Sequence, residues 1–176
     1  MLGKILLAIG LASAAAGLVS AAPDRGSLAL SPCDDNPDAR CGTLEVFEDR
    51  DARTGRRIAI RVMALPAKGP RRAPDPVFAL AGGPGQSAIE AFAGGDLLGG
   101  LREERDIVLV DLRGTGGSNP LRCNLLGRPG DLASLLSDIF PLEEVKACRQ
   151  RLEKVADLTR YTTRHAMDDL DVATVH

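Results

Sequence analysis

Aromatic side chains and an excess of either charge are both scarce in this sequence. The chain has no tryptophan and a single tyrosine, and its 22 basic and 24 acidic residues are well mixed, giving a formal net charge of -2. Proteins that bind nucleic acid use basic grooves and aromatic rings that stack on bases. Because neither feature is present, we expect no nucleic-acid partner.

The ligand spacing of a metal site is also absent. No C-x-x-C and no closely spaced pair of histidines occurs, although structural zinc sites are built from such pairs. We therefore expect no metal, and in an exported chain the even count of four cysteines indicates disulfides. Three pairings are possible, and proximity along the chain favours Cys33–Cys41 and Cys123–Cys148. The second disulfide closes a loop of about 25 residues, which contributes about 3–4 kcal/mol in the chain-entropy account.

The N-terminus carries an apolar run that is shorter than a membrane span. Residues 5–19 are small or branched apolar residues, preceded by Lys4 and followed by small side chains up to Ala21. This pattern is typical of a secretory signal peptide, residues 1–21; an uncleaved anchor is the alternative, but a span needs about 20 residues. Neither a lipoprotein cysteine nor a twin-arginine pair is present. We therefore expect an exported protein, periplasmic or extracellular, that contacts the membrane only transiently through its signal peptide.

Without the 21 residues of the signal peptide, 155 of the 176 residues remain, which is enough for one ordinary domain. Residues 22–40 are rich in proline, aspartate and serine and are interpreted as an irregular leader, with residues 41–176 as the folded portion. Residues 41–48 and 57–65 alternate apolar and polar side chains, which predicts an antiparallel hairpin. A proline-rich basic link, residues 66–76, follows this hairpin.

The pattern then changes to strands that alternate with helices. Residues 77–81 and 106–111 are short continuous apolar runs, typical of strands buried on both faces. A helical or broken helical stretch lies between them, so the two runs predict a parallel βαβ unit and an α/β fold class. Further helices are expected over residues 142–155 and from a cap at Thr162 or Thr163 onward. One face of the first of these helices is apolar: Leu142, Val145, Leu152 and Val155.

The glycine-rich segment after the first apolar strand allows two interpretations. Residues 83–88 match G-x-G-x-x-A, as in a dinucleotide-binding turn. Pro84 removes one backbone donor, however. The acid that should follow after about 20 residues is Asp111, 28 residues after Gly83. Nicotinamide cofactors are also scarce outside the cytoplasm, and no phosphate-binding G-x-x-x-x-G-K-[ST] is present. We therefore expect no cofactor.

The other interpretation of this segment is an oxyanion hole. Acyl-transfer enzymes stabilise a negatively charged tetrahedral intermediate with backbone N–H groups held close to the substrate carbonyl. Glycine allows that close approach and the dihedral angles it requires, and Pro84 stiffens the loop. We expect Gly82 or Gly83 to supply one oxyanion donor, with Pro84 and Gly85 shaping the loop.

Two segments together resemble a known family. "LAGGPGQSA" and "RDIVLVDLRGTGGSNPLRC" are similar to the two glycine-rich motifs of the proline iminopeptidase and tripeptidyl aminopeptidase group, secreted serine peptidases with an α/β-hydrolase fold. The resemblance covers about residues 40–176. In the exported branch of this group a disulfide is common where Cys123 and Cys148 stand, and "YTTRHAMDDLD" looks like the helix before its nucleophile strand. The second motif consists of Asp111, Arg113, Gly114, Gly116 and Ser118.

The resemblance implies a function for the whole enzyme. It implies the release of residues or short peptides from the N-termini of peptide substrates by acyl-enzyme chemistry, without metal or cofactor. Asp111 and Arg113 are assigned to structure, because an acid and an arginine at a strand's end can pair and brace the neighbouring glycine turns at Gly114 and Gly116. An exposed surface pair is the alternative for Asp111 and Arg113.

The family's nucleophile is a serine in G-x-S-x-G, and this sequence lacks that motif. Ser87 and Ser118 both lack the second glycine, and we expect each to serve its own loop through local hydrogen bonds. Neither histidine is assigned to a triad, because in this family the histidine comes long after the serine. His165, Asp168 and Asp169 could lie on one helix face and form a metal-binding group, but a solvated helix face is the favoured interpretation.

These observations predict the N-terminal portion of an exported α/β-hydrolase peptidase, truncated before the nucleophile elbow as a fragment or incomplete gene model, and inactive alone. The apolar face from Leu170 to Val175 is then expected to stay uncovered, which would make the chain marginally stable or prone to aggregate. An esterase or lipase-like hydrolase is an alternative within the fold. A secreted, non-catalytic binding module held by two disulfides is the alternative from another class.

Overall fold

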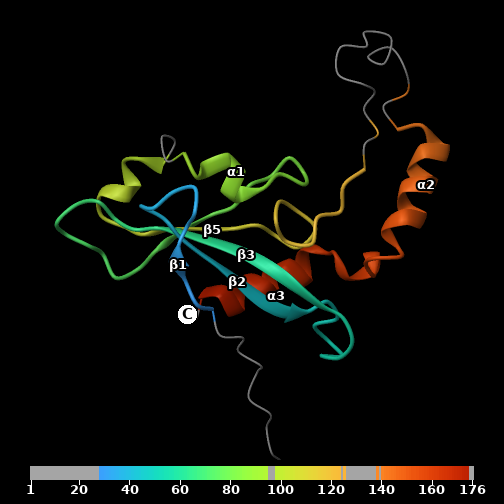
Figure 1. Cartoon of the computed structure of the whole chain (residues 1–176), viewed down its shortest axis with the longest axis horizontal. Coiled ribbons are helices and arrows are strands. Elements are labelled where there is room, and N and C mark those ends of the chain that lie inside the picture. Colours follow the sequence, from blue (N-terminus) through green and yellow to red (C-terminus); the bar gives the residue numbers. More distant parts are fainter. Residues whose placement is uncertain (1–27, 95–97, 124, 126–137, 139, 175–176) are drawn as a thin grey trace, which may run out of the picture.

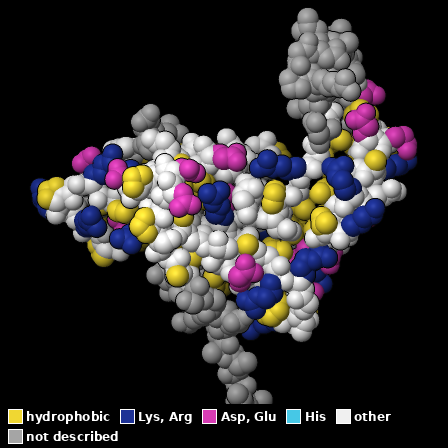
Figure 2. Space-filling view, in the orientation of Figure 1, with side chains coloured by type: hydrophobic (Ala, Val, Ile, Leu, Met, Phe, Trp, Pro, Cys, Tyr) yellow, Lys and Arg dark blue, Asp and Glu magenta, His cyan; other side chains and the backbone are white. Residues whose placement is uncertain are grey.

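The computed structural model describes residues 28–94, 98–123, 125, 138 and 140–174. The expected signal peptide lies outside these residues. Within the described ranges, no helix is both long enough and apolar enough to cross a membrane. The described part of the face drawn in Figure 2 carries basic and acidic side chains interspersed, without a continuous basic stripe.

A five-stranded mixed sheet forms the centre of the fold, in the order β1-β2-β3-β5-β4 (Figure 1). β2 (Arg40–Phe47) and β3 (Arg57–Leu65) pair antiparallel, with Leu44 opposite Ile60. The hairpin predicted from the alternation of these segments is therefore confirmed. β1 (Ser31–Pro32) pairs antiparallel with β2, so the leader expected to be irregular contributes a strand, which is too short to show a periodic pattern.

The predicted parallel pair is also confirmed. β4 (Val77–Ala79) and β5 (Ile107–Val110) run parallel, and β5 pairs antiparallel with β3 on its other side. The connection between β4 and β5 contains α1 (Ala88–Phe92) and the 3-10 helix η2 (Leu101–Glu103). β5 is largely buried, as expected, but β4 is only half-buried. The expectation is wrong for β4 because no strand among the described residues pairs with its outer edge.

Helices lie on both faces of the sheet, so two cores form (Figure 1). α1 packs on one face, through Ala88 and Ile89, and α3 (Thr163–Thr174) packs on the other. Side chains alternate along a strand, so β3 contributes to both cores. The core under α1 includes Met63, Leu65, Ile107 and Leu109. The core under α3 includes Leu44, Val46, Ile58, Ile60, Val62 and Val110.

The C-terminal helix α3 closes the second core. Thr162 caps it, because the His165 N–H donates to Thr162 Oγ1 (3.4 Å), in agreement with the predicted cap. Val172 is buried against the β2–β3 hairpin, and Leu170 packs against the same cluster. The expectation that this apolar face stays uncovered is therefore wrong for the described residues, since the hairpin provides the surface that it needs. Val175 lies outside the described residues.

α2 (Leu142–Leu152) lies away from the sheet at one end of the molecule (Figure 1). The predicted helix is confirmed over Leu142–Leu152, three residues shorter than expected, and Val155 lies beyond it. Its predicted apolar face is only partly covered within the described structure: Leu142 is 64% and Val155 58% exposed, while Val145 and Leu152 are half-buried. The buried residue of α2 is Cys148, which is linked to Cys123. A short 3-10 helix, η4 (Leu158–Arg160), connects this region to α3.

The four cysteines form the disulfides Cys33–Cys41 and Cys123–Cys148. This is the pairing that proximity along the chain favours. The first disulfide ties the leader to β2, and the second ties the segment that follows β5 to α2. Two intrachain disulfides are typical of proteins that fold in an oxidising compartment.

Candidate functional site

Two glycine-rich loops extend from the carboxyl ends of the parallel strands. The first glycine loop, residues 80–87, follows β4, and the second glycine loop, residues 111–119, follows β5. Because β4 and β5 are parallel neighbours, both loops leave the sheet on the side where the carboxyl ends of these strands lie. In α/β sheets ligands bind outside the carboxyl ends of the strands, so the two loops define the candidate site.

The first glycine loop presents bare backbone to solvent. Gly83 and Gly85 have φ angles of 117° and 91°, which L-residues with a side chain rarely adopt. The Gln86 N–H donates to the Gly82 carbonyl (3.3 Å), which closes the turn around Pro84. Residues 82–86 are all exposed, and among the described residues no acceptor is bonded to the N–H of Gly82 or Gly83. The two glycines expected to supply oxyanion donors are therefore exposed, and their N–H groups have no bonded acceptor among the described residues.

Ser87 anchors the base of the first glycine loop. Its Oγ accepts a hydrogen bond from the Glu90 N–H (3.0 Å) as the N-cap of α1, and it donates one to Asp111 Oδ1 (2.6 Å). Ser87 is buried. Its cap is the local hydrogen bond that the sequence predicted, and the bond to Asp111 adds a longer link to the second loop.

Asp111 joins the two glycine loops. Its carboxylate is 1% exposed, Oδ1 accepts from Ser87 Oγ and from the Ile89 N–H (3.2 Å), and Oδ2 accepts from the Gly117 N–H (2.9 Å). A buried carboxylate is costly unless it is hydrogen-bonded, and three donors meet that requirement here. A Cβ added at Gly116, whose φ is 48°, would overlap the same carboxylate. Asp111 and Gly116 thus shape the loops, as expected from the sequence.

The second glycine loop bonds several of its backbone groups within the loop and its buried side chains to other elements. The Gly114 N–H donates to the Ser118 carbonyl (2.7 Å), and the Ser118 N–H donates to the Thr115 carbonyl (2.8 Å). The fully buried Ser118 hydroxyl accepts from the Arg61 N–H on β3 (2.8 Å). The local hydrogen bond expected of the Ser118 side chain is therefore replaced by a bond to a residue 57 positions away. Gly114 has a φ of 85° and lies against Tyr161.

Arg113 connects the second glycine loop to the opposite layer. Its guanidinium donates two hydrogen bonds to the Asp169 carboxylate (2.7 and 2.9 Å), and Nη1 donates to the carbonyls of Glu48 and Arg160, each at 2.8 Å. Arg113 and Asp111 therefore do not pair with each other, contrary to expectation, because their side chains at the end of β5 point to different layers. Burial raises the pKa of the Asp169 carboxyl group, against the opposing effect of Arg113.

The helix face with His165 and Asp169 is not the solvated face that the spacing suggested. Both residues are buried, and each has a polar partner: Asp169 pairs with Arg113, and His165 Nδ1 lies 2.8 Å from Thr162 Oγ1. His165 Nε2 is 3.6 Å from Asp51 Oδ2. Among the described residues, no group of three or more His, Cys, Asp or Glu side chains is placed to hold a metal. Asp168 is half-buried on the same helix.

Glu48 and Tyr161 are structural residues of the site that sequence reasoning missed. Glu48 is buried at the end of β2, where Oε1 accepts from the Asp157 N–H and from the Tyr161 hydroxyl, each at 3.0 Å. Asn119 also donates to the Tyr161 hydroxyl. Burial raises the pKa of Tyr161 to about 12, and the Glu48 carboxylate adds to the shift. The sequence signal for Glu48 is weak, because Glu48 appears there only as the last residue of an alternating apolar and polar segment.

The site can donate hydrogen bonds, but it lacks an activated nucleophile among the described residues. Ser87 and Ser118 are buried and already bonded to Asp111 and to the Arg61 N–H, and His165 is bonded to Thr162. The sequence matches none of the known family models. A search of curated proteins likewise finds no match. The interpretation of the site therefore depends on its geometry and on the sequence motifs.

Proposed function

We propose that the chain forms the N-terminal part of an exported α/β-hydrolase whose first glycine loop provides half of an oxyanion hole. The order of elements supports this proposal: an antiparallel hairpin leads into a parallel pair, and each parallel strand ends in a glycine-rich loop. The two disulfides support export, because such bonds persist in oxidising compartments. The two motifs of the proline iminopeptidase and tripeptidyl aminopeptidase group coincide with these two loops.

One observation carries the proposal. Gly82 and Gly83 are exposed and their N–H groups have no bonded acceptor among the described residues, while the base of their loop is fixed by the buried contact of Ser87 with Asp111. Donors that are fixed before reaction stabilise a developing oxyanion without the cost of reorganising during the reaction. Pro84 and the positive φ angles of Gly83 and Gly85 hold the donors in this arrangement.

The reaction proposed for the whole enzyme is acyl transfer to a serine followed by hydrolysis. The substrate class that the resemblance favours is a peptide with a free N-terminus, and an ester is the alternative because both substrates pass through the same oxyanion. Ser87 and Ser118 are excluded as nucleophiles by their burial and their bonds. We therefore assign no member of the serine, acid and histidine triad to the described residues.

The coding DNA beyond His176 provides the first test. An in-frame or frameshifted G-x-S-x-G, followed by an acid and a histidine in that order, is the expected finding. A stop codon with no downstream hydrolase sequence contradicts the proposal and favours a secreted binding module held by two disulfides.

The second test uses the purified 176-residue chain. We expect no turnover of an aminoacyl chromogenic substrate, because the site has no activated nucleophile among the described residues. Turnover that a serine-reactive phosphonate abolishes would contradict the assignment of the triad to another segment. Joining the chain to the downstream sequence should produce activity. Replacing Gly82 by proline in that protein deletes its N–H at a position without a positive φ and with open space for a side chain, and should lower kcat by about 100-fold or more.

A further inference from the structure

The two disulfides lie in different surroundings. Cys33 is 8% exposed, its N–H donates to the Ala39 carbonyl (3.1 Å), and it belongs to the core under α1 with Met63. Its partner Cys41 is half-buried against the same core. Cys123 is exposed on the segment after the second glycine loop, whereas its partner Cys148 is buried on α2. A thiol in solution therefore reaches the second disulfide from the side of Cys123.

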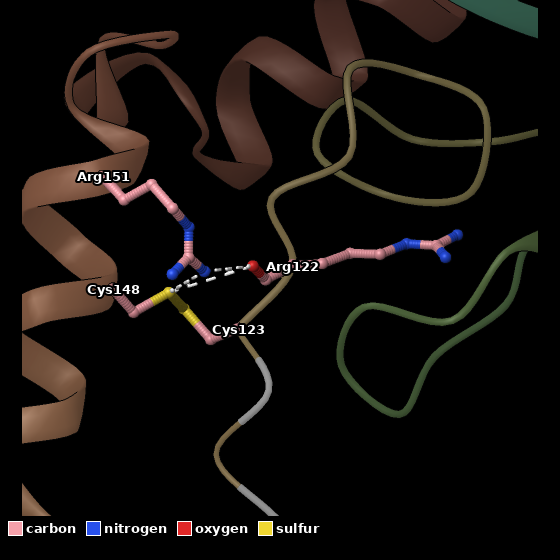
Figure 3. The surroundings of a disulfide bond; sticks show 4 residues. All are labelled: Arg122, Cys123, Cys148 and Arg151. Carbon is pink, nitrogen blue, oxygen red and sulfur yellow. Dashed lines mark hydrogen bonds between the residues drawn. A yellow bond between two sulfur atoms is a disulfide. The ribbon is translucent and has the colours of Figure 1, made fainter.

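A cationic side chain contacts the buried sulfur. Arg151 Nη2 lies 3.2 Å from Cys148 Sγ and donates a hydrogen bond to the Arg122 carbonyl oxygen (3.1 Å), which holds the guanidinium beside the disulfide (Figure 3). Within the described residues, no such cationic contact is made to either sulfur of Cys33–Cys41. A nearby cation stabilises a thiolate, and a stabilised thiolate is a faster leaving group. The exposed sulfur is thus the point of attack, and the buried one is the leaving group.

We propose that Cys123–Cys148 is a thiol–disulfide exchange site that is reduced by an external dithiol. One thiolate of the dithiol, having lost its proton to solvent, attacks Cys123 Sγ. The S–S bond breaks, and its electron pair leaves with Cys148 as a thiolate beside Arg151. The second sulfur of the dithiol then displaces Cys123, which takes up the second proton. The dithiol is oxidised to its disulfide by two electrons, and the protein disulfide is reduced.

Reduction removes one of the attachments of α2. The chain after α2 is bound to the body through the Asp157 N–H, which donates to Glu48 Oε1 (3.0 Å). The disulfide holds the middle of the helix against the segment that follows the second glycine loop. Opening the disulfide leaves the Arg151 bond to the Arg122 carbonyl as a weaker link at that point. The exchange site therefore controls how firmly α2 is held.

The rates of reduction of the two disulfides test the proposal within a single molecule. The folded chain is treated with dithiothreitol at neutral pH, samples are trapped with N-ethylmaleimide over time, and labelled cysteines are counted by peptide mass spectrometry. We expect Cys123 and Cys148 to be labelled at least about tenfold faster than Cys33 and Cys41, because exchange rates follow access and leaving-group stability. Equal rates, or faster labelling of Cys33 and Cys41, would overturn the proposal.

Arg151→Gln tests the leaving group. It removes the charge and should slow reduction of Cys123–Cys148 by about threefold to tenfold, since a less stabilised thiolate leaves more slowly. Arg149→Gln is the matched control, because Arg149 pairs with Glu153 on the same helix (2.7 Å) and should leave the rate unchanged. An unchanged rate in Arg151→Gln overturns the proposal.

The labelling rate of Cys33 and Cys41 in each variant serves as an internal report on folding. If Arg151→Gln unfolds the chain, both disulfides become faster together. Arg151→Lys, which keeps the charge, then decides. In this variant Cys123–Cys148 is expected to stay faster to reduce than Cys33–Cys41, and full loss of the rate difference between the two disulfides counts against the exchange site.

Discussion

The two glycine loops have similar compositions and opposite uses of their backbone. In the first loop Gly82 and Gly83 are exposed, and their N–H groups have no acceptor among the described residues. In the second loop several backbone donors are bonded within the loop, as in the bonds from the N–H groups of Gly114 and Ser118, and the Gly117 N–H is bonded to Asp111. Glycine-rich sequence therefore indicates a close approach of backbone, but it does not say whether a ligand or the protein itself makes that approach.

The largest expected effect comes from breaking the link between the second glycine loop and α3. Arg113→Met removes both hydrogen bonds to the buried Asp169 carboxylate and leaves it only the longer contact with Arg50 Nε (3.6 Å). It should lower the free energy of unfolding by about 3–5 kcal/mol. Chemical denaturation monitored by circular dichroism measures this loss. The double variant Arg113→Met/Asp169→Leu should recover much of it, because no unpaired charge then stays buried. If the single and double variants lose equal stability, the ion pair is not the cause.

The next effect concerns the carboxylate that joins the loops. Asp111→Ala leaves Ser87 Oγ and two backbone N–H groups without their acceptor, and it should cost about 2–3 kcal/mol. Amide hydrogen exchange at Ile89 and Gly117 should become faster in this variant. Asp106→Ala is the control, because Asp106 lies before the other end of β5 and accepts one bond from the Ala67 N–H (2.7 Å). Accelerated exchange at Gly117 in the control would contradict the assignment.

A pair of glycine substitutions separates packing from backbone strain. Gly116 and Gly85 both have positive φ angles, but a Cβ at Gly116 would overlap Asp111, whereas one at Gly85 meets open space. Gly116→Ala should therefore cost about 2–3 kcal/mol in unfolding free energy and Gly85→Ala about 1 kcal/mol. Thermal or urea unfolding of both variants measures the difference. Equal losses would show that the second loop is not packed more tightly than the first.

The smallest effect is a dependence on alkaline pH at the edge of the second loop. The pKa of Tyr161 is raised from 10.0 to about 12, so the folded chain holds this proton more tightly than the unfolded chain. The resulting stability is fully present below pH 10 and is lost as the pH rises through 12. Tyr161→Phe should flatten the fall in unfolding free energy over this window, measured by urea titrations at a series of pH values. An unchanged slope in Tyr161→Phe would contradict this.

Local patterns in the sequence predicted the strands well. The alternation of residues 57–65 and the apolar run of 106–111 correspond to β3 and β5. Both signals are local, because the side-chain period of a strand and its burial determine the types of consecutive residues. β1 was missed because its two residues carry no period. The helix α2 was predicted, but its covering surface was not, since periodicity identifies an apolar face without naming what packs on it.

The contacts of the site were harder to predict than its location. The glycine motifs placed both loops at the ends of parallel strands, which the structure bears out. The partner of Arg113 is 56 residues away on α3, and the partner of Ser118 is on β3. No local pattern links such positions, because each bond depends on how the layers stack. The burial of His165 and Asp169 follows from the same stacking, and the spacing of the helix alone could not reveal it.

The carboxylate of Asp111 also constrains how the lengths of the two glycine loops can evolve. One oxygen holds the base of the first glycine loop, and the other holds Gly117 in the second loop. The span from Ser87 through Asp111 to Gly117 therefore has a fixed length, and an insertion or deletion at the base of either loop would have to preserve it. Among homologous chains, the lengths of these two loops should vary together or not at all.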